Sequence, residues 1–164
     1  CFFHVVAKFG KAEELKSAID VIGIENLNVF DINKYTALHH CSISGRVENV
    51  KVLIGYGANI NAQSSDETRN WLPIHYASKF GYKEIVEEFI EAGVDKEITT
   101  SFGLTPLHVS AEFGSFEVAK YLTSINPAWA NLFRPFLTAS LERLNLFVTF
   151  LESLILLLSS LLMP

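Results

Sequence analysis

The sequence lacks several features that mark secreted or nucleic-acid-binding proteins. Two of its 164 residues are cysteines, which excludes a disulfide scaffold, and it contains no Asn-x-Ser/Thr acceptor for N-glycosylation. Thirteen basic residues stand against 18 acidic ones, so the formal charge of −5 offers no cationic surface for phosphates. We therefore expect a cytoplasmic protein that binds no nucleic acid, with membrane-associated and secreted proteins as the alternatives.

What the chain does contain is a heptapeptide that recurs four times. Each copy carries a histidine and is followed by a glycine. Units that recur at about 33 residues are typical of arrays of stacked helix pairs. The histidines are His4, His39, His75 and His108, at separations of 35, 36 and 33 residues, and the glycines Gly10, Gly45, Gly81 and Gly114 repeat these separations.

The fourth copy shows how the residues build one unit. Thr105 can cap the free amides that open a helix, and Pro106 suits the first helical turn. Gly114 permits the left-handed turn that ends this helix, and the apolar spacing in residues 116–122 predicts a second helix. The third copy has Leu72 where a capping hydroxyl belongs, which should cost about 1 kcal/mol of local stability.

These units resemble ankyrin repeats, whose motif is Thr-Pro-Leu-His, then Ala-Ala, Gly, an apolar pair and Gly-Ala-Asp/Asn-x-Asn. Thr105 to His108, Thr36 to His39 and Gly57 to Asn61 carry the likeness, which covers residues 1 to about 125. The resemblance implies an all-α solenoid of stacked helix-turn-helix units joined by short β-hairpin loops. It also implies an inter-repeat structural role, through hydrogen bonds to neighbouring backbone, for His4, His39, His75 and His108.

The repeat spacing divides the chain into units. We place a partial repeat at residues 1–33 and further repeats at residues 34–66, 67–99 and 100–131. Because residues 3–10 already read as the first helix of a repeat, we expect the chain to be a fragment of a longer protein.

Residues 132–164 form a separate apolar tail that contains no glycine. Its apolar residues recur at alternating spacings of four and three, which indicates one or two amphipathic helices. Three interpretations stay open. The tail is a degenerate fifth repeat that caps the stack, a membrane or partner contact through residues 146–163, or the product of a frame error at the end of a partial gene.

No residue pattern indicates catalysis or a cofactor. We find no nucleophile with a partnered base, no glycine-rich phosphate loop and no carboxylate pair placed for acid–base work. The run His39-His40-Cys41 suggests a metal site, but a structural metal needs about four converging ligands, whereas the repeated histidines lie along the stack about 10 Å apart. We expect no enzyme activity, no metal and no cofactor, and an exposed side chain for His40.

By the same resemblance, a protein partner binds the concave surface that the hairpins and first helices form. Several aromatic residues fall at these contact positions, where a solvent-facing ring is costly unless a partner covers it. The alternative is that each phenylalanine packs over the edge of its own repeat. Lysines beside the rings favour a partner with acidic character. The predicted partner-binding residues are Lys8, Phe9, Tyr35, Arg69, Trp71, Lys79, Phe80, Phe102 and Phe113.

We therefore predict a protein–protein interaction module of the scaffold or adaptor type, whose oligomeric state the sequence leaves open. The rival interpretation is a membrane-acting protein, either an ion channel or a latrotoxin-like pore-forming toxin. There the repeats would be the soluble arm, and the tail would engage lipid. A third interpretation is an ankyrin arm attached to an enzyme domain.

Overall fold

The computed structural model describes residues 2–64 and 70–125. Contacts within the chain separate a first unit, Cys1–Leu122, from a second, Thr123–Pro164, and the account below concerns the first. Across the described residues the regular structure is helical and contains no strand. This confirms the expected all-α class. The predicted tail at residues 132–164, with its segment 146–163, lies outside the described residues.

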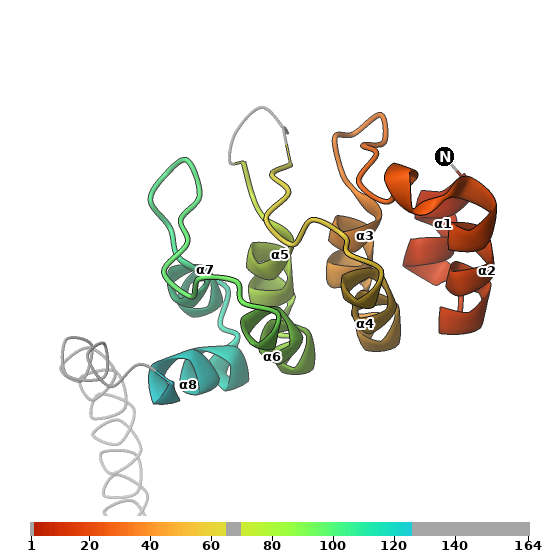
Figure 1. Ribbon diagram of the computed structural model, residues 1–164. Helices are drawn as coiled ribbons and strands as arrows, with labels where there is room; N and C mark the ends of the chain where they lie inside the picture. The colour runs from red at the N-terminus through yellow and green to blue at the C-terminus, as the bar shows by residue number, and fades with distance from the viewer. Residues whose placement is uncertain (1, 65–69, 126–164) are drawn as a thin grey trace, which may run out of the picture. The chain divides into compact units, whose positions relative to one another are not determined.

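The helices of the first unit form two layers, as Figure 1 shows. The first helices of successive pairs pack on one another in the order α1, α3, α5 and α7, and the second helices α2, α4 and α6 form the other layer. A short 3-10 helix, η1 (Ile24–Asn26), follows α2. The pairs are α1 (Phe2–Phe9) with α2 (Ala12–Ile22), α3 (Ala37–Ser44) with α4 (Val47–Gly55), α5 (Pro73–Phe80) with α6 (Lys83–Glu91), and α7 (Pro106–Glu112) with α8 (Phe116–Ser124).

Two threonines open the first helices as the motif requires. The Thr36 hydroxyl accepts a hydrogen bond from the His39 amide at 3.5 Å, and the Thr105 hydroxyl accepts one from the His108 amide at 3.3 Å. At the start of α5, Leu72 makes no side-chain capping bond. The Leu72 amide donates to the imidazole of His75 at 3.2 Å. This helix therefore keeps the bond from the N-cap amide to the histidine and lacks the bond from the histidine amide to an N-cap side chain.

The turn after α3 shows why glycine closes a first helix. Gly45 has a left-handed backbone with φ of 69°, a region that disfavours side chains. A Cβ atom added there would also lie 2.7 Å from the ring of Tyr82, which comes from the next repeat. Gly45 therefore serves both the turn and the contact between neighbouring repeats.

Polar side chains from one repeat hold the open end of the first helix in the repeat before it. The amide of Asn49 donates to the carbonyls of Ala7 and Gly10, each at 3.0 Å. The guanidinium of Arg46 reaches the carbonyls of Lys8 and Phe9, each at 3.3 Å. These contacts satisfy carbonyls that the helix itself leaves without partners, and they join repeat to repeat.

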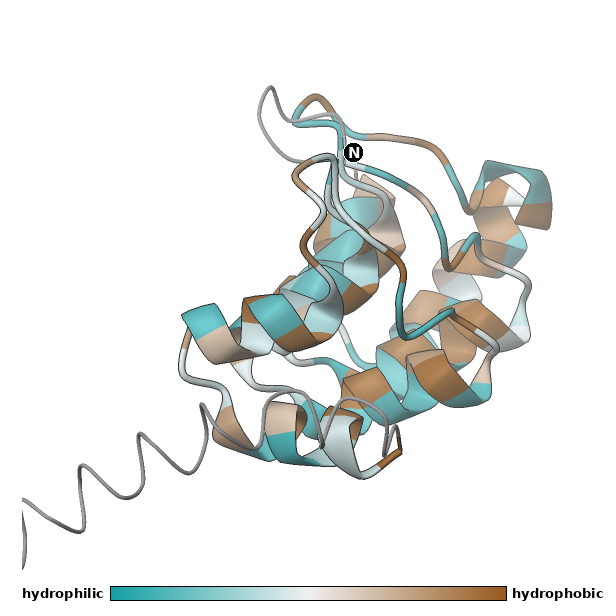
Figure 2. Ribbon diagram, turned by 90° about the vertical axis from the view of Figure 1, so that its left-hand side faces the viewer, coloured by the Kyte–Doolittle hydropathy of each residue, from teal (hydrophilic) through white to brown (hydrophobic). Residues whose placement is uncertain are grey.

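The core runs along the stack between the two layers. Figure 2 shows hydrophobic and hydrophilic positions interleaved along each helix, as amphipathic helices require. Leu38, Leu53, Ile74 and Phe89 are among the largest fully buried side chains. Cys41 is buried, and burial raises the pKa of its thiol, so it acts as a small apolar residue.

Hairpin-like loops join successive helix pairs and project from one edge of the stack (Figure 1). Each is closed at its base by a backbone hydrogen bond, which matches the short hairpins that the resemblance implies. The bonds run from Asp31 N to Tyr35 O at 2.8 Å, from Ser64 N to Trp71 O at 2.9 Å and from Thr100 N to Leu104 O at 3.0 Å.

Candidate functional site

Two of the repeated histidines, His4 and His39, bond through Nε2 to the loop that follows their helix pair. Nδ1 of His39 accepts from the amide and hydroxyl of Thr36, so the proton sits on Nε2, which donates to Trp71 O at 3.1 Å. Nε2 of His4 donates to Val29 O at 2.9 Å. His108 pairs through Nδ1 with its own capping residue, Thr105. The rings of His4 and His39 thus link a first helix to a later loop, whereas the bonds from His108 to Thr105 lie at the start of its own helix.

Burial keeps two of these histidines neutral. Burial lowers the pKa of His39 to about 4, although the nearby carbonyl of Trp71 opposes the shift. Burial also lowers the pKa of His75 to about 4, although the nearby backbone of Ile98 and Leu104 opposes the shift. Within residues 2–64 and 70–125, no group of three or more histidine, cysteine or acidic side chains is placed to hold a metal ion.

His40 corrects an expectation from the sequence, because its side chain is 14% exposed. Its Nε2 donates to Asp31 Oδ2 at 2.8 Å, and Asp31 Oδ1 accepts from the amides of Asn33 and Tyr35, each at 2.9 Å. Burial alone would raise the pKa of Asp31, but these hydrogen bonds outweigh burial and lower it. Asp31 is the partner that the sequence could have suggested for His40. Only the geometry of the hairpin, however, places its carboxylate next to α3.

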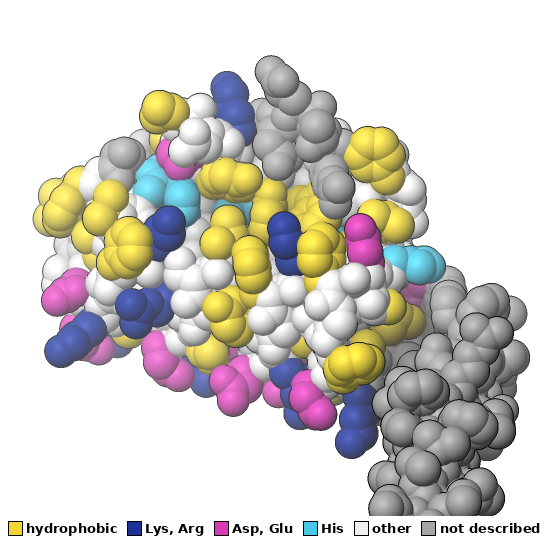
Figure 3. Space-filling view, turned by 180° about the vertical axis from the view of Figure 1, so that it is seen from behind, with side chains coloured by type: hydrophobic (Ala, Val, Ile, Leu, Met, Phe, Trp, Pro, Cys, Tyr) yellow, Lys and Arg dark blue, Asp and Glu magenta, His cyan; other side chains and the backbone are white. Residues whose placement is uncertain are grey.

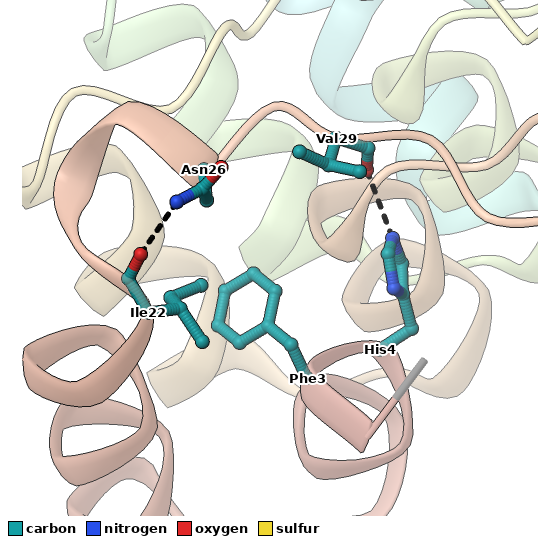
Figure 4. A pocket seen from close by; sticks show the side chains of 5 residues that line it. All are labelled: Phe3, His4, Ile22, Asn26 and Val29. Atoms are coloured by element: carbon teal, nitrogen blue, oxygen red, sulfur yellow. Dashed lines mark hydrogen bonds between the residues drawn. The ribbon is translucent and has the colours of Figure 1, made fainter.

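A cavity of about 350 Å³ lies beside α1 and η1 (Figure 4). Phe3, Ile22 and Val29 give it an apolar lining. The two polar side chains at its edge bond to backbone, since His4 donates to Val29 O and Asn26 donates to Ile22 O at 2.6 Å. The cavity therefore offers apolar contact with little polar chemistry.

Four of the nine predicted partner-binding residues come together in one place, which we call the Lys79 cluster: Trp71, Lys79, Phe80 and Phe113. The Lys79 ammonium lies 4.8 Å from the ring centroid of Phe113, 5.4 Å from that of Phe80 and 5.5 Å from that of Trp71. The rings of Trp71 and Phe113 meet edge to face at 6.2 Å. A cation over several aromatic faces is electrostatically favourable.

Trp71 corrects a second expectation, because the sequence predicts a solvent-facing ring and the residue is only 2% exposed. It packs with Tyr76 and Val109 in a buried cluster, and its ring centroid lies 5.1 Å from that of Tyr76. Tyr35 is half-buried at the edge of the same cluster and accepts a hydrogen bond from the Tyr76 hydroxyl at 3.3 Å. The hairpin bases thus fold over the first helices and bury the aromatic residues they carry.

The other predicted aromatics do face solvent. Phe80 and Phe113 are 45% and 41% exposed, and Phe9 and Phe102 are 63% and 65% exposed. The Lys8 ammonium lies 5.1 Å from the ring centroid of Phe9, so α1 carries a second lysine–aromatic pair. Arg69 lies outside the described residues.

The surface that carries these residues differs in charge from the opposite layer. Figure 3 shows hydrophobic and basic side chains across this face, with most of the acidic side chains gathered along its lower edge. None of the helices described over residues 2–64 and 70–125 is long and apolar enough to cross a membrane. The arrangement suits contact with another macromolecule on the face of the first helices.

Comparison with known proteins identifies the family of these repeats. A family model described as "Ankyrin repeats (3 copies)" matches residues 2–64 and 63–131. Palmitoyltransferase AKR1 of Kluyveromyces lactis is 34% identical over 109 residues, which are 66% of this chain and 14% of that protein. Protein phosphatase 1 regulatory subunit 27 of Homo sapiens is 40% identical over 70 residues, 43% of this chain and 44% of that protein. The chain thus spans less than half the length of either relative.

Proposed function

The chain belongs to the ankyrin-repeat family, whose repeats are protein-interaction modules, and from this premise we propose that it binds a protein partner on the face of its first helices and hairpins. The proposed role is that of a scaffold or adaptor in the cytoplasm, without catalytic activity of its own. The palmitoyltransferase relative is matched over 14% of its length, so its name assigns no activity to this chain.

The observation that carries this proposal is the Lys79 cluster. Phe80 and Phe113 keep 45% and 41% of their surface exposed, although Phe113 meets the buried ring of Trp71 edge to face. Aromatic residues in such positions dominate binding energy at interfaces, where truncation of one ring commonly costs about 2 kcal/mol or more. Preformed helices hold these rings in place, so little ordering entropy is lost on association.

We propose two kinds of contributor to this interface. Trp71 and Tyr35 support the surface from below because they are buried or half-buried. The histidines His4, His39, His75 and His108 act in the stack and do not meet the partner. The residues proposed to touch the partner are Lys8, Phe9, Arg69, Lys79, Phe80, Phe102 and Phe113.

Site-specific photo-cross-linking in a lysate of the source cell tests the proposal. A photoreactive phenylalanine analogue replaces Phe80 or Phe113, and in a matched variant it replaces Glu84 on the exposed second-helix layer. We expect a shared set of cross-linked proteins from the first two positions that the third does not give. Those proteins are then purified, and their binding is measured with Phe80→Ala. Cross-links that come equally from Glu84, or binding that Phe80→Ala leaves unchanged, would refute the proposed surface.

A further inference from the structure

We propose that the partner presents an extended segment with two acidic residues about six positions apart, each next to an apolar residue. The two acidic residues pair with Lys8 and Lys79, and the apolar residues pack on the exposed rings beside these lysines. This inference rests on the proposed function and specifies the chemistry of the partner.

The two lysine–aromatic pairs are equivalent positions of the repeat. Lys8–Phe9 ends α1 directly before Gly10, and Lys79–Phe80 ends α5 directly before Gly81. In both pairs the ammonium lies over the following ring, at 5.1 Å from the Phe9 centroid and 5.4 Å from the Phe80 centroid. The chain thus presents the same cation and the same exposed ring twice on one face.

The charge of this face favours an acidic partner. Lys8, Lys79 and Glu112 are the charged residues of the four first helices, whereas the four second helices carry nine acidic and four basic residues. Lysines of the second helices pair with neighbouring glutamates: Lys16 with Glu13, Lys51 with Glu48 and Glu88, and Lys83 with Glu87. In the described part of the chain, neither Lys8 nor Lys79 has a carboxylate within 4 Å.

The aromatic rings position each lysine ammonium so that it can pair with a carboxylate of the partner. Lys79 contacts the faces of three rings, so its long side chain is already ordered before a partner arrives. The exposed edges of Phe80 and Phe113 stay available to an apolar side chain on the partner. A lysine and an aromatic edge side by side therefore fit an acidic residue followed by an apolar one.

The separation of the pairs sets the spacing in the partner. Helix α1 packs on α3 and α3 packs on α5, so two helix-packing steps of about 10 Å each separate the pairs by roughly 20 Å. An extended chain advances about 3.3 Å per residue and covers this distance in about six residues. The repeat between the two pairs has the uncharged Ile43–Ser44 at the equivalent position, so the middle of the bound segment needs no charged residue.

Selection from a phage library of random peptides about twelve residues long tests this inference with the whole 164-residue chain. We expect the enriched peptides to carry two acidic–apolar elements about six residues apart. Synthetic versions should lose about tenfold in affinity with Lys79→Gln or Lys8→Gln, and should keep it with the matched variant Lys16→Gln. Circular dichroism checks that all three variants remain folded.

Four results would overturn the inference. They are enriched peptides without acidic residues, acidic elements at some other spacing, peptide affinities unchanged by Lys79→Gln, or Lys79-dependent binding to phosphatidylserine vesicles in place of peptides. In the first two cases, loss of binding with Phe80→Ala would leave the proposed surface intact. Peptides that bind independently of Phe80, Phe113 and both lysines would count against the proposed function as well.

Discussion

At the scale of single residues, the aromatic side chains divide into buried supports and exposed contacts. Trp71 and Phe102 both lie in or beside hairpins, yet one is 2% and the other 65% exposed. Sequence position alone assigns them the same role, because the hairpin motif specifies where a loop begins and leaves open how it folds over its neighbours. The burial of Trp71 depends on Tyr76 and Val109 from two different repeats. A pattern within one repeat cannot reveal a contact of this kind.

Truncation of Trp71 should therefore unfold the protein more readily. Trp71→Ala leaves a cavity between Tyr76 and Val109 and should lower the free energy of unfolding by about 3–5 kcal/mol. Phe102→Ala is the matched control, because its ring is exposed and its loss should change stability by about 0.5 kcal/mol or less. Urea titration followed by circular dichroism measures both. Equal effects of the two substitutions would contradict the assignment of Trp71 to the core.

Buried histidines should make the stack sensitive to acid. His39 and His75 have pKa values lowered to about 4 by burial, whereas in the unfolded chain they take up a proton below about pH 6.5. The unfolded state thus binds more protons between these values, so stability is full above pH 6.5 and falls as the pH drops toward 4. From pH 7.5 to pH 5 we expect a loss of about 2 kcal/mol for each histidine.

Urea unfolding at pH 7.5 and pH 5 checks this dependence. The variant His75→Gln lacks one of the two buried groups and should show a smaller difference between the two pH values, whatever its own stability. A wild-type chain that is equally stable at both values would show that burial does not hold these rings neutral.

At the scale of helices, the ends of each element are where the sequence was most informative. The threonine, histidine and glycine of the motif predict where first helices begin and end, and their hydrogen bonds follow from local geometry. The pair between His40 and Asp31 could not be read in the same way. Both residues are visible in the sequence, but only the hairpin closed at Asp31 and Tyr35 places the carboxylate against α3.

The missing cap of α5 offers a stabilising substitution. Leu72 has an extended backbone at the N-cap with φ of −87°, close to that of Thr36 and Thr105. Leu72→Thr should place a hydroxyl where it accepts from the His75 amide and should stabilise the start of the helix by about 1 kcal/mol. Because Leu72 is fully buried, the lost apolar contact opposes this gain, and Leu72→Val is the control of similar size without a hydroxyl.

Thermal and urea unfolding of the two variants separate the gain from the capping hydroxyl from the loss of apolar contact. We expect Leu72→Thr to be more stable than Leu72→Val by about 1 kcal/mol, since the variants differ mainly in the capping group. If the valine variant is as stable as the threonine variant or more so, the N-cap of α5 does not need a hydroxyl.

At the scale of the whole first unit, stability is spread along a line. Each helix pair packs on its neighbours, so the loss of one inter-repeat contact should loosen the adjacent pair more than distant ones. The sequence predicts this organisation through the period of its histidines and glycines. The polar links made by Arg46 and Asn49 were not predicted, because the motif does not specify those positions.

The amide of Asn49 should set how firmly the first repeat stays attached. Asn49→Ala removes its hydrogen bonds to Ala7 O and Gly10 O and leaves those carbonyls without this partner. We expect amide hydrogen exchange of α1 and α2 to become about tenfold faster or more, with little change in α5 and α6. Asn61→Ala, an exposed position, is the matched control. Uniform acceleration along the chain would contradict a linear distribution of stability.

The two lysine–aromatic pairs sit on repeats that are not direct neighbours, and this has a mechanical consequence. A change in the angle between successive repeats changes the distance between the two ammonium groups. A segment bound to both pairs should hold this distance fixed, and a change in the spacing of the repeats should weaken its binding. The affinity for such a segment should therefore depend on the spacing between the first and third repeats.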